Sequence, residues 1–190
     1  MQGQPAPNRE DAGRKPIKFE YDSAKATHAM LWLLHKHGGA MDKLKLVKLI
    51  FYADREHLAK FGRPIAGGHY VAMIHGPVPS ELLDNLNHAA EGSGLLFQVV
   101  GTKIIALSSA NEDELSESDI QVLEQTNSVF GYHDTFALRD LTHRLRAWSK
   151  NYPNPTENTS HPLPYEDFFL DLEGDEMLQV IREHQEAMDF

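Results

Sequence analysis

The sequence predicts an α+β domain that is predominantly helical, with helices packed around a small antiparallel sheet or hairpin. Several segments carry apolar residues at helical spacing, and N-capping residues precede them. Two short runs of β-forming residues flank Gly101-Thr102, a pattern typical of a hairpin. The length of 190 residues suits one domain, and no internal repeat divides it.

Capping residues and glycines set the expected limits of the helices. Asp22 and Asp42 precede the first two helices, and glycines follow both. Helices are expected over residues 23–37, 43–60, 81–90, from 116 or 118 to 130, from 134 or 135 to 150, and 175–188.

The remaining segments are expected to be extended or irregular. Residues 67–77 are interpreted as a strand, and 95–100 with 103–107 as the hairpin. A short extended piece is expected over residues 17–21, a turn at Gly92-Ser93-Gly94, and a loop over 152–164, which holds four prolines.

The two ends of the chain differ in composition from its middle. Residues 1–15 are rich in proline, glycine and glutamine without periodicity, so we expect a disordered tail. Residues 16–190 are expected to form the single domain. Within it, the segment 151–190 carries 10 acidic residues and one basic residue, so nearly all of the formal net charge of −10 lies there. This asymmetry fits either a basic partner or a solvated helix face.

Composition excludes several classes of protein. The chain has no cysteine, which excludes a disulfide framework and a thiol nucleophile. No apolar run approaches the roughly 18 residues of a membrane-spanning helix, and no apolar targeting segment begins the chain, so a cytoplasmic protein is expected. The acidic balance argues against direct binding of nucleic acid, whose phosphates require cations.

The segment 43–60 has the strongest helical pattern. Its apolar residues cover more than half of the helical wheel, which predicts a central helix. Lys45, Lys48, Tyr52 and Arg55 form the remaining polar stripe. Asp54 and His57 fall inside the apolar arc, where they are either an acid–base pair or, as we favour, a hydrogen-bonded structural pair.

The segment 135–150 predicts one continuous helix with two distinct faces. Its apolar stripe ends in Trp148, which is expected to be a core anchor. His143 lies on the opposite side with Arg139 and Arg146 at helical spacing. These three side chains either bind an anionic group of a partner or pair with the acidic residues of 166–189.

Eleven histidines raise the question of a metal, but their spacing does not support one. His35 and His37 do not share a helix face, and the sequence has no HExxH motif. Phosphate-binding and dinucleotide-binding glycine motifs are also absent. We therefore expect no metal and no cofactor.

Two blocks of sequence resemble a known family. Leu46-Val47-Lys48-Leu49-Ile50-Phe51-Tyr52-Ala53 with Gly62-Arg63-Pro64, and then Ala72-Met73-Ile74-His75-Gly76-Pro77-Val78, resemble the Panacea domain of the SocA-like antitoxin family, formerly a domain of unknown function in phage-associated proteins. Leu141-Thr142-His143 with Trp148 resembles its second signature. The resemblance spans residues 26–150. Met73 stands where the family usually has tryptophan, and His75 where an aromatic residue or lysine is common.

The resemblance implies an antitoxin that neutralises a cognate toxin by direct contact, without catalysis. The acidic total suits a basic toxin. A second possibility is an adaptor that delivers the toxin to a ClpXP-type protease. An acid–base enzyme using Asp54, His57 or His143 is the alternative from another class. The candidate partner-binding residues are Lys48, Tyr52, Met73, His75, Arg139, His143 and Arg146.

The N-terminal tail yields the first prediction. Deleting residues 1–15 is expected to change the melting temperature by no more than about two degrees, because a segment with so few apolar residues contributes little burial. Thermal unfolding of the full and shortened chains measures this. A larger drop would mean that the tail packs on the domain.

Overall fold

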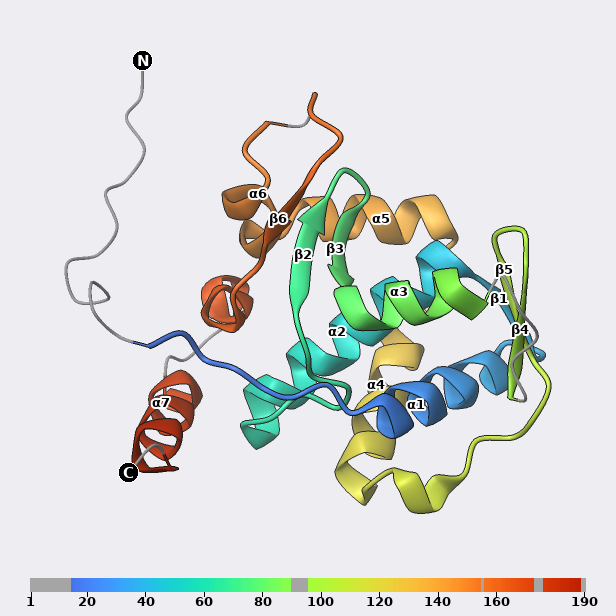
Figure 1. Cartoon of the computed structure of the whole chain (residues 1–190), viewed down its shortest axis with the longest axis horizontal. Coiled ribbons are helices and arrows are strands. Elements are labelled where there is room, and N and C mark those ends of the chain that lie inside the picture. Colours follow the sequence, from blue (N-terminus) through green and yellow to red (C-terminus); the bar gives the residue numbers. More distant parts are fainter. Residues whose placement is uncertain (1–14, 90–95, 155, 173–175, 189–190) are drawn as a thin grey trace.

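The helix α2 (Lys43–Phe61) lies at the centre of the fold, and every residue from Leu46 to Arg55 is buried. The computed structural model describes residues 15–89, 96–154, 156–172 and 176–188. The helices α1 (Ser23–Lys36), α4 (Glu117–Phe130) and α5 (Thr135–His143) pack around α2 (Figure 1). The predicted central helix is confirmed.

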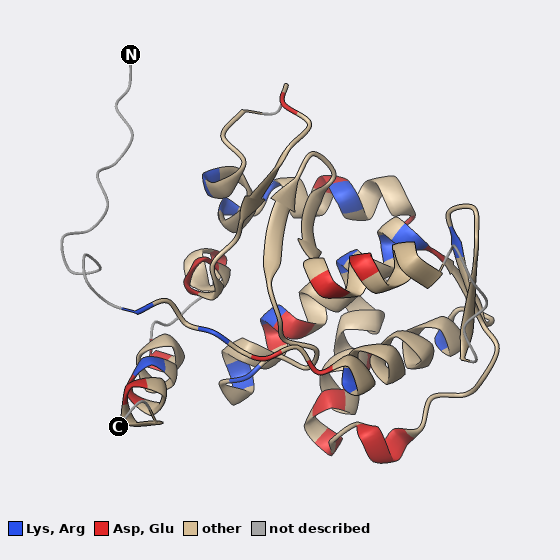
Figure 2. Cartoon of the chain, in the orientation of Figure 1, with Lys and Arg blue, Asp and Glu red and all other residues tan. Residues whose placement is uncertain are grey.

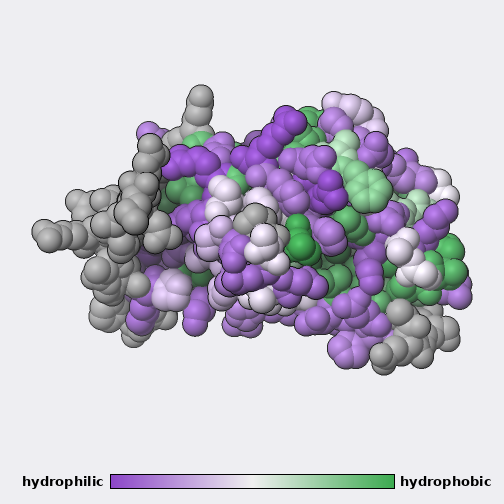
Figure 3. Space-filling view, turned by 90° about the horizontal axis from the view of Figure 1, so that it is seen from above, coloured by the Kyte–Doolittle hydropathy of each residue, from purple (hydrophilic) through white to green (hydrophobic). Residues whose placement is uncertain are grey.

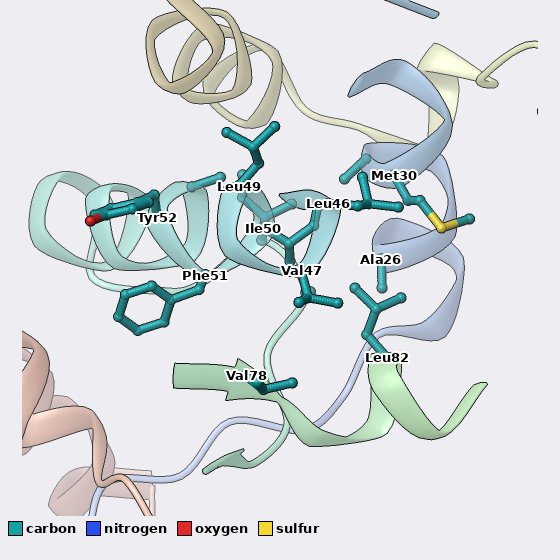
Figure 4. Packing of buried hydrophobic residues seen from close by; sticks show 14 of the residues in the cluster. Ala26, Met30, Leu46, Val47, Leu49, Ile50, Phe51, Tyr52, Val78 and Leu82 are labelled. Atoms are coloured by element: carbon teal, nitrogen blue, oxygen red, sulfur yellow. The ribbon is translucent and has the colours of Figure 1, made fainter. Parts of the chain in front are cut away.

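Side chains leave α2 in several directions and meet different neighbours. Figure 4 shows Leu46 directed toward Met30 of α1, while Val47 is directed toward the region of Val78 and Leu82. These residues are at most 4% exposed. Burial of large apolar side chains on most of its circumference makes α2 the main source of hydrophobic stabilisation.

Two three-stranded antiparallel sheets flank the helices. One has the order β1–β5–β4 and is built from Ala40–Asp42, Lys103–Ala106 and Phe97–Val100. The other has the order β3–β2–β6 and is built from Gly76–Pro79, Tyr70–Met73 and Ser160–Pro162. In the second sheet, Ala72 of β2 lies opposite both Pro77 and His161. The predominantly helical α+β class is therefore confirmed, with a second sheet in addition to the predicted hairpin.

Shorter elements complete the chain. The helices α3 (Ser80–Ala89) and α6 (Arg146–Asn151) lie beside the second sheet, and α7 (Glu176–Met188) contacts the end of α2 (Figure 1). Two 3-10 helices cover Glu112–Glu114 and Tyr165–Asp171. Within the described residues, no helix combines the length and the apolar character needed to cross a membrane. The expected tail up to residue 14 and the turn at Gly92-Ser93-Gly94 lie outside the described residues.

The predicted N-caps are confirmed by their hydrogen bonds. The Asp22 and Asp42 carboxylates accept from the backbone N–H groups of Lys25 and Leu44 at 3.0 and 2.9 Å. Ser116 and Asp119 form a capping box at the start of α4. These side chains satisfy amides that have no partner within the first turn of a helix.

Three sequence predictions were wrong in detail. The helix expected over 135–150 breaks at Leu145, because the Asp171 carboxylate accepts from the backbone N–H groups of Arg146 and Ala147 and begins α6 there. The strand expected over 67–77 is instead part of the β2–β3 hairpin, whose turn is Ile74-His75 and whose next residue, Gly76, has a φ of 97°. The loop expected over 152–164 contains β6, which pairs with β2.

A buried charge network fastens three helices together. The Asp119 carboxylate on α4 lies 3.1 Å from His57 Nε2 on α2, 2.9 Å from Arg63 Nη2 and 3.3 Å from Lys25 Nζ on α1. The Asp119 and His57 side chains are completely buried. Burial raises the pKa of Asp119, but hydrogen bonds from His57 and Ser116 and the charge of Arg63 outweigh it, so the pKa lies below its ordinary value.

Replacing this carboxylate tests the network. Asp119→Asn is expected to lower the free energy of unfolding by roughly 3 kcal/mol at pH 7, because basic groups then lose their buried partner. Since the folded-state pKa is depressed, this contribution is complete above pH ~4 and is lost as the pH falls through the folded value, so the difference between the two proteins narrows in acid. Urea unfolding at several pH values measures it. Glu117→Gln, on an exposed neighbour, is the control, and an equal loss there would contradict the assignment.

Candidate functional site

An apolar cleft opens beside the turn that joins β2 to β3. Its volume is about 440 Å³, and its wall comes from the first half of α2, the β2–β3 turn, α3 and the loop before β6. The lining residues are Lys43, Leu44, Val47, Met73, Ile74, His75, Val78, Leu83 and Asn158. Figure 3, which views the molecule from above, shows hydrophobic residues among the hydrophilic ones on this side of the protein.

The turn above the cleft is held from below by a buried lysine. Lys48 Nζ donates to the carbonyl of Pro77 at 2.6 Å, and the Lys48 side chain is fully buried. A Cβ atom on Gly76 would lie 2.4 Å from Thr142 Oγ1 and 3.1 Å from Lys48 Nζ, and the φ of this residue is positive. Only glycine therefore allows the turn, Lys48 and Thr142 to approach so closely.

Trp148 and His143 support the same turn from the side of α5 and α6. The indole Nε1 of Trp148 donates to the carbonyl of Met73 at 2.8 Å. The His143 ring stacks on the Trp148 ring with 4.1 Å between centroids, and His143 Nε2 is buried without a hydrogen-bond partner among the described residues. Trp148 is partly buried, so it packs against the core but also fixes the turn.

Several basic groups surround His143. Burial lowers its pKa, and the charges of Arg139, Lys48 and His75 lower it further, while Asp140 opposes them. Burial alone holds the pKa of Lys48 well below its ordinary value. The base of the turn is therefore a site where positive charge is disfavoured by burial and by neighbouring basic groups.

The seven candidate partner-binding residues do not form one surface. Met73 and His75 line the cleft, and His143 lies behind it. Lys48 and Tyr52 were expected on a polar stripe but are interior, because α4 and α5 cover that side of α2, and Tyr52 stacks on Phe130. Arg55 of the same stripe is also buried and donates to the carbonyl of Phe168.

Arg139 and Arg146 are separated by the break between α5 and α6. Arg139 pairs with Asp140 at 2.6 Å and lies over the Phe136 ring. Arg146 donates to the carbonyl of Leu170 and follows the new helix start that Asp171 caps. The predicted Arg139–His143–Arg146 face required a continuous helix and is not formed.

Asp54 and His57 form neither an acid–base pair nor the hydrogen-bonded pair favoured from the sequence, because each side chain serves a separate structural network. The Asp54 carboxylate accepts from the backbone N–H groups of Ile65, Ala66 and Gly67 at 3.0–3.1 Å and from the Tyr70 hydroxyl at 2.5 Å. His57 Nδ1 donates to the carbonyl of Arg63, and its Nε2 faces Ser118 and Asp119. Both side chains are inaccessible, so they hold loops and helices in place.

The acidic C-terminal segment divides into two roles. Among its described residues, three carboxylates bind groups outside the segment: Glu166 accepts from the backbone N–H of Ile17, Asp167 pairs with Lys150, and Asp171 accepts from the first backbone N–H groups of α6. Other acidic groups of this segment, such as Glu183 and Glu186, are exposed. Contacts within the same chain thus use part of the negative charge of residues 151–190.

The signature residues of three sequence blocks, 46–53, 72–78 and 141–148, meet at this site. Lys48 from the first block, Gly76 and Pro77 from the second, and Thr142, His143 and Trp148 from the third converge on one turn. A family model described as the SocA-like antitoxin, Panacea domain, matches residues 46–149, which is more than half of the chain. The chain belongs to this family. No curated protein and no solved structure matches it significantly.

The Panacea domain of this chain also has features that sequence reasoning missed. Leu83 and Asn158 join Met73 in the cleft although they are distant in sequence, and Ile74, the residue after Met73, lines it as well. Tyr132 and Phe136, at the junction of α4 and α5, are 76% and 65% exposed. The sequence signal for this exposed aromatic patch was the spacing of Tyr132 and Phe136, which lie four residues apart on either side of the start of α5. Among the described residues, no group of acidic and histidine side chains is arranged to hold a metal ion.

The buried Lys48 gives a prediction about stability. Because its pKa is lowered in the folded state, the unfolded chain binds a proton that the folded chain lacks, and stability rises with pH toward the ordinary lysine value. Lys48→Met is expected to remove this dependence, whose slope has an upper limit of about 1.4 kcal/mol per pH unit. Urea unfolding at pH 7 and pH 9.5 measures it, with Lys18→Met on an exposed lysine as control. Identical pH dependence in both variants would show that Lys48 is charged when folded.

Proposed function

We propose that this Panacea domain neutralises a toxin protein by direct contact and that the cleft beside the β2–β3 turn is its recognition surface. The observation that supports this most is the apolar cleft, whose wall includes the half-buried side chains of Met73, Ile74 and Leu83. Recessed apolar pockets of this kind hold the anchor residues that contribute most to protein–protein binding.

The exposed aromatic residues support the same function. Tyr132 and Phe136 offer large rigid side chains on the junction of α4 and α5, and α5 also contacts β3 of the recognition hairpin. Aromatic residues and arginine are enriched in interfaces, and Arg139 lies directly over Phe136. An additional contact area at this position would extend the interface beyond the cleft.

The site offers little support for catalysis. Asp54 and His57 are inaccessible and lie in different networks, and His143 is stacked behind the turn. An acid–base enzyme needs two polar groups that converge on a substrate position. The titratable residues that line the cleft are Lys43 and His75, and no nucleophilic side chain lies among its lining residues.

The charge of the chain favours a basic toxin at long range. Exposed acidic residues gather at Glu112–Glu114 and Glu117, and more lie on α7 (Figure 2). Such groups act at a distance of about 10 Å at 0.1 M salt and accelerate encounter with a cationic partner. The proposal also places this binding event in the cytoplasm.

Delivery of the toxin to a ClpXP-type protease is the second mechanism we consider. Its supporting feature is α7, an exposed amphipathic helix at the end of the chain, which has Val180 and Met188 on its surface and one buried residue, Ile181. A helix attached by so little burial is accessible to another protein. Both mechanisms require that the toxin binds the domain first.

Co-expression with the protein encoded next to this chain tests the proposal. The pair is expected to co-purify, and the domain is expected to restore growth that the neighbouring protein arrests. Met73→Asp is expected to weaken binding by roughly tenfold or more, because it places a charge in the apolar cleft. Leu107→Asp, which places the same charge at an exposed apolar residue outside the cleft, is the matched surface control.

Two further results separate the mechanisms. Growth rescue that persists in cells lacking ClpXP supports direct inhibition, whereas rescue that depends on the protease supports the adaptor. A neighbouring protein that neither binds the domain nor arrests growth would contradict the proposed function.

A further inference from the structure

The cleft combines apolar walls with a basic rim. Its six apolar lining residues are Leu44, Val47, Met73, Ile74, Val78 and Leu83. Its polar lining residues are Lys43, His75 and Asn158, and none of the nine is acidic. Asp84 follows Leu83 on α3 but does not line the cleft.

The rim has unused hydrogen-bond donors. Lys43 Nζ donates to Asn87 Oδ1 at 2.8 Å, and the described part of the chain offers no acceptor to its other two ammonium N–H groups. The side chains of His75 and Asn158 make no hydrogen bond to any residue that the structure describes, and both are exposed. Three donor-bearing side chains from α2, the turn and the loop before β6 thus border one apolar space.

Besides burial, Arg139, Lys48 and His75 lower the pKa of His143 behind the turn, but the buried Lys48 has a lowered pKa of its own and is not counted as a charge at the rim. Asp140 is the carboxylate that opposes them, and it is already paired with Arg139 at 2.6 Å. The lining residues include the ammonium of Lys43 and no carboxylate, so the cleft favours a negative group although the chain as a whole carries a net charge of −10.

We infer that the cleft receives a segment of the toxin in which an apolar side chain lies next to a carboxylate. The apolar side chain fills the space between α2, the turn and α3, and the carboxylate accepts from Lys43, His75 or Asn158. The inference rests on the proposed function and adds the chemistry of the anchor. The proposed segment is acidic although the protein itself is acidic. The net charge would attract a toxin that is basic overall, whereas the cleft would bind one carboxylate and one apolar side chain of that toxin.

A basic anchor fits the cleft less well. A lysine or arginine entering it would meet Lys43 and His75 without an acidic partner among the lining residues. A purely apolar anchor would fill the walls but leave the donors of the rim covered and unpaired, which is costly. The combination of apolar side chain and carboxylate satisfies both parts of the site.

A fragment that carries only these two groups tests the inference on the free chain. N-acetyl-L-phenylalanine, which has a ring and a carboxylate, is titrated against the isotope-labelled protein and followed by the amide NMR signals. Saturable shifts are expected at Met73, Ile74, His75, Val78 and Leu83. The uncharged methylamide of the same compound is expected to bind at least about fivefold more weakly.

Two variants distinguish a direct contact between Lys43 and the carboxylate from the effect of a changed net charge. Lys43→Glu is expected to weaken binding of the acid to the level of the methylamide, whereas Lys18→Glu, on an exposed lysine of the N-terminal segment, is expected to leave it unchanged. The NMR spectra themselves report whether each variant is folded. Ile74→Trp, which fills the cleft, is expected to abolish binding of both compounds and keeps the test valid if Lys43→Glu unfolds.

The outcomes distinguish this inference from the proposed function. Equal binding of acid and methylamide, or shifts that map outside the cleft, would overturn the inference. If the fragment binds as described but the neighbouring protein does not bind the domain, the proposed function fails and the chemistry of the cleft stands. If the neighbouring protein binds and its affinity is unaffected by both Lys43→Glu and Ile74→Trp, the anchor lies elsewhere and the inference is wrong.

Discussion

The fold depends on one constraint: α2 is enclosed, so its polar side chains must find partners inside the protein. Each of them organises a different neighbour. Lys48 binds the carbonyl of Pro77 and holds the β2–β3 turn, Asp54 binds three amides of the loop after α2, and Arg55 binds the carbonyl of Phe168. His57 completes the set by joining α4 through Asp119. An unpaired buried polar group is costly, which makes these contacts strict determinants of position.

The surface that we propose for recognition follows from this arrangement. The β2–β3 turn is fixed from beneath by Lys48, from one side by Thr142 against Gly76, and through Trp148, which binds the carbonyl of Met73. A turn held at several points presents Met73, Ile74 and His75 in a defined geometry. Preorganisation of this kind lowers the entropy lost on binding, so a small domain can recognise a partner through a short exposed segment.

The charge of the protein acts on two length scales. Exposed carboxylates lie on the segment 112–117 and on α7, whereas the cleft is lined by Lys43 and His75 and by no acidic residue. Part of the acidic C-terminal segment is internal, since Glu166, Asp167 and Asp171 tie it to the N-terminal segment and to α6. Under the proposed function, the net charge governs the rate at which a toxin encounters the domain, and the residues that line the cleft govern which groups of the toxin bind.

The sequence by itself determined the α+β class, the central helix, the N-caps and the hairpin around Gly101-Thr102, because these depend on periodicity and on neighbours a few residues away. It also identified the family, and two of its candidate partner-binding residues, Met73 and His75, line the cleft. Tertiary structure decided the rest. The break at Leu145 depends on Asp171, which lies 26 residues further on, and β6 exists only because β2 offers it an edge. Whether Lys48 and Tyr52 are exposed was likewise decided by helices that pack over them. A helical wheel records which residues share a face, but only the packing of distant elements determines which faces reach solvent.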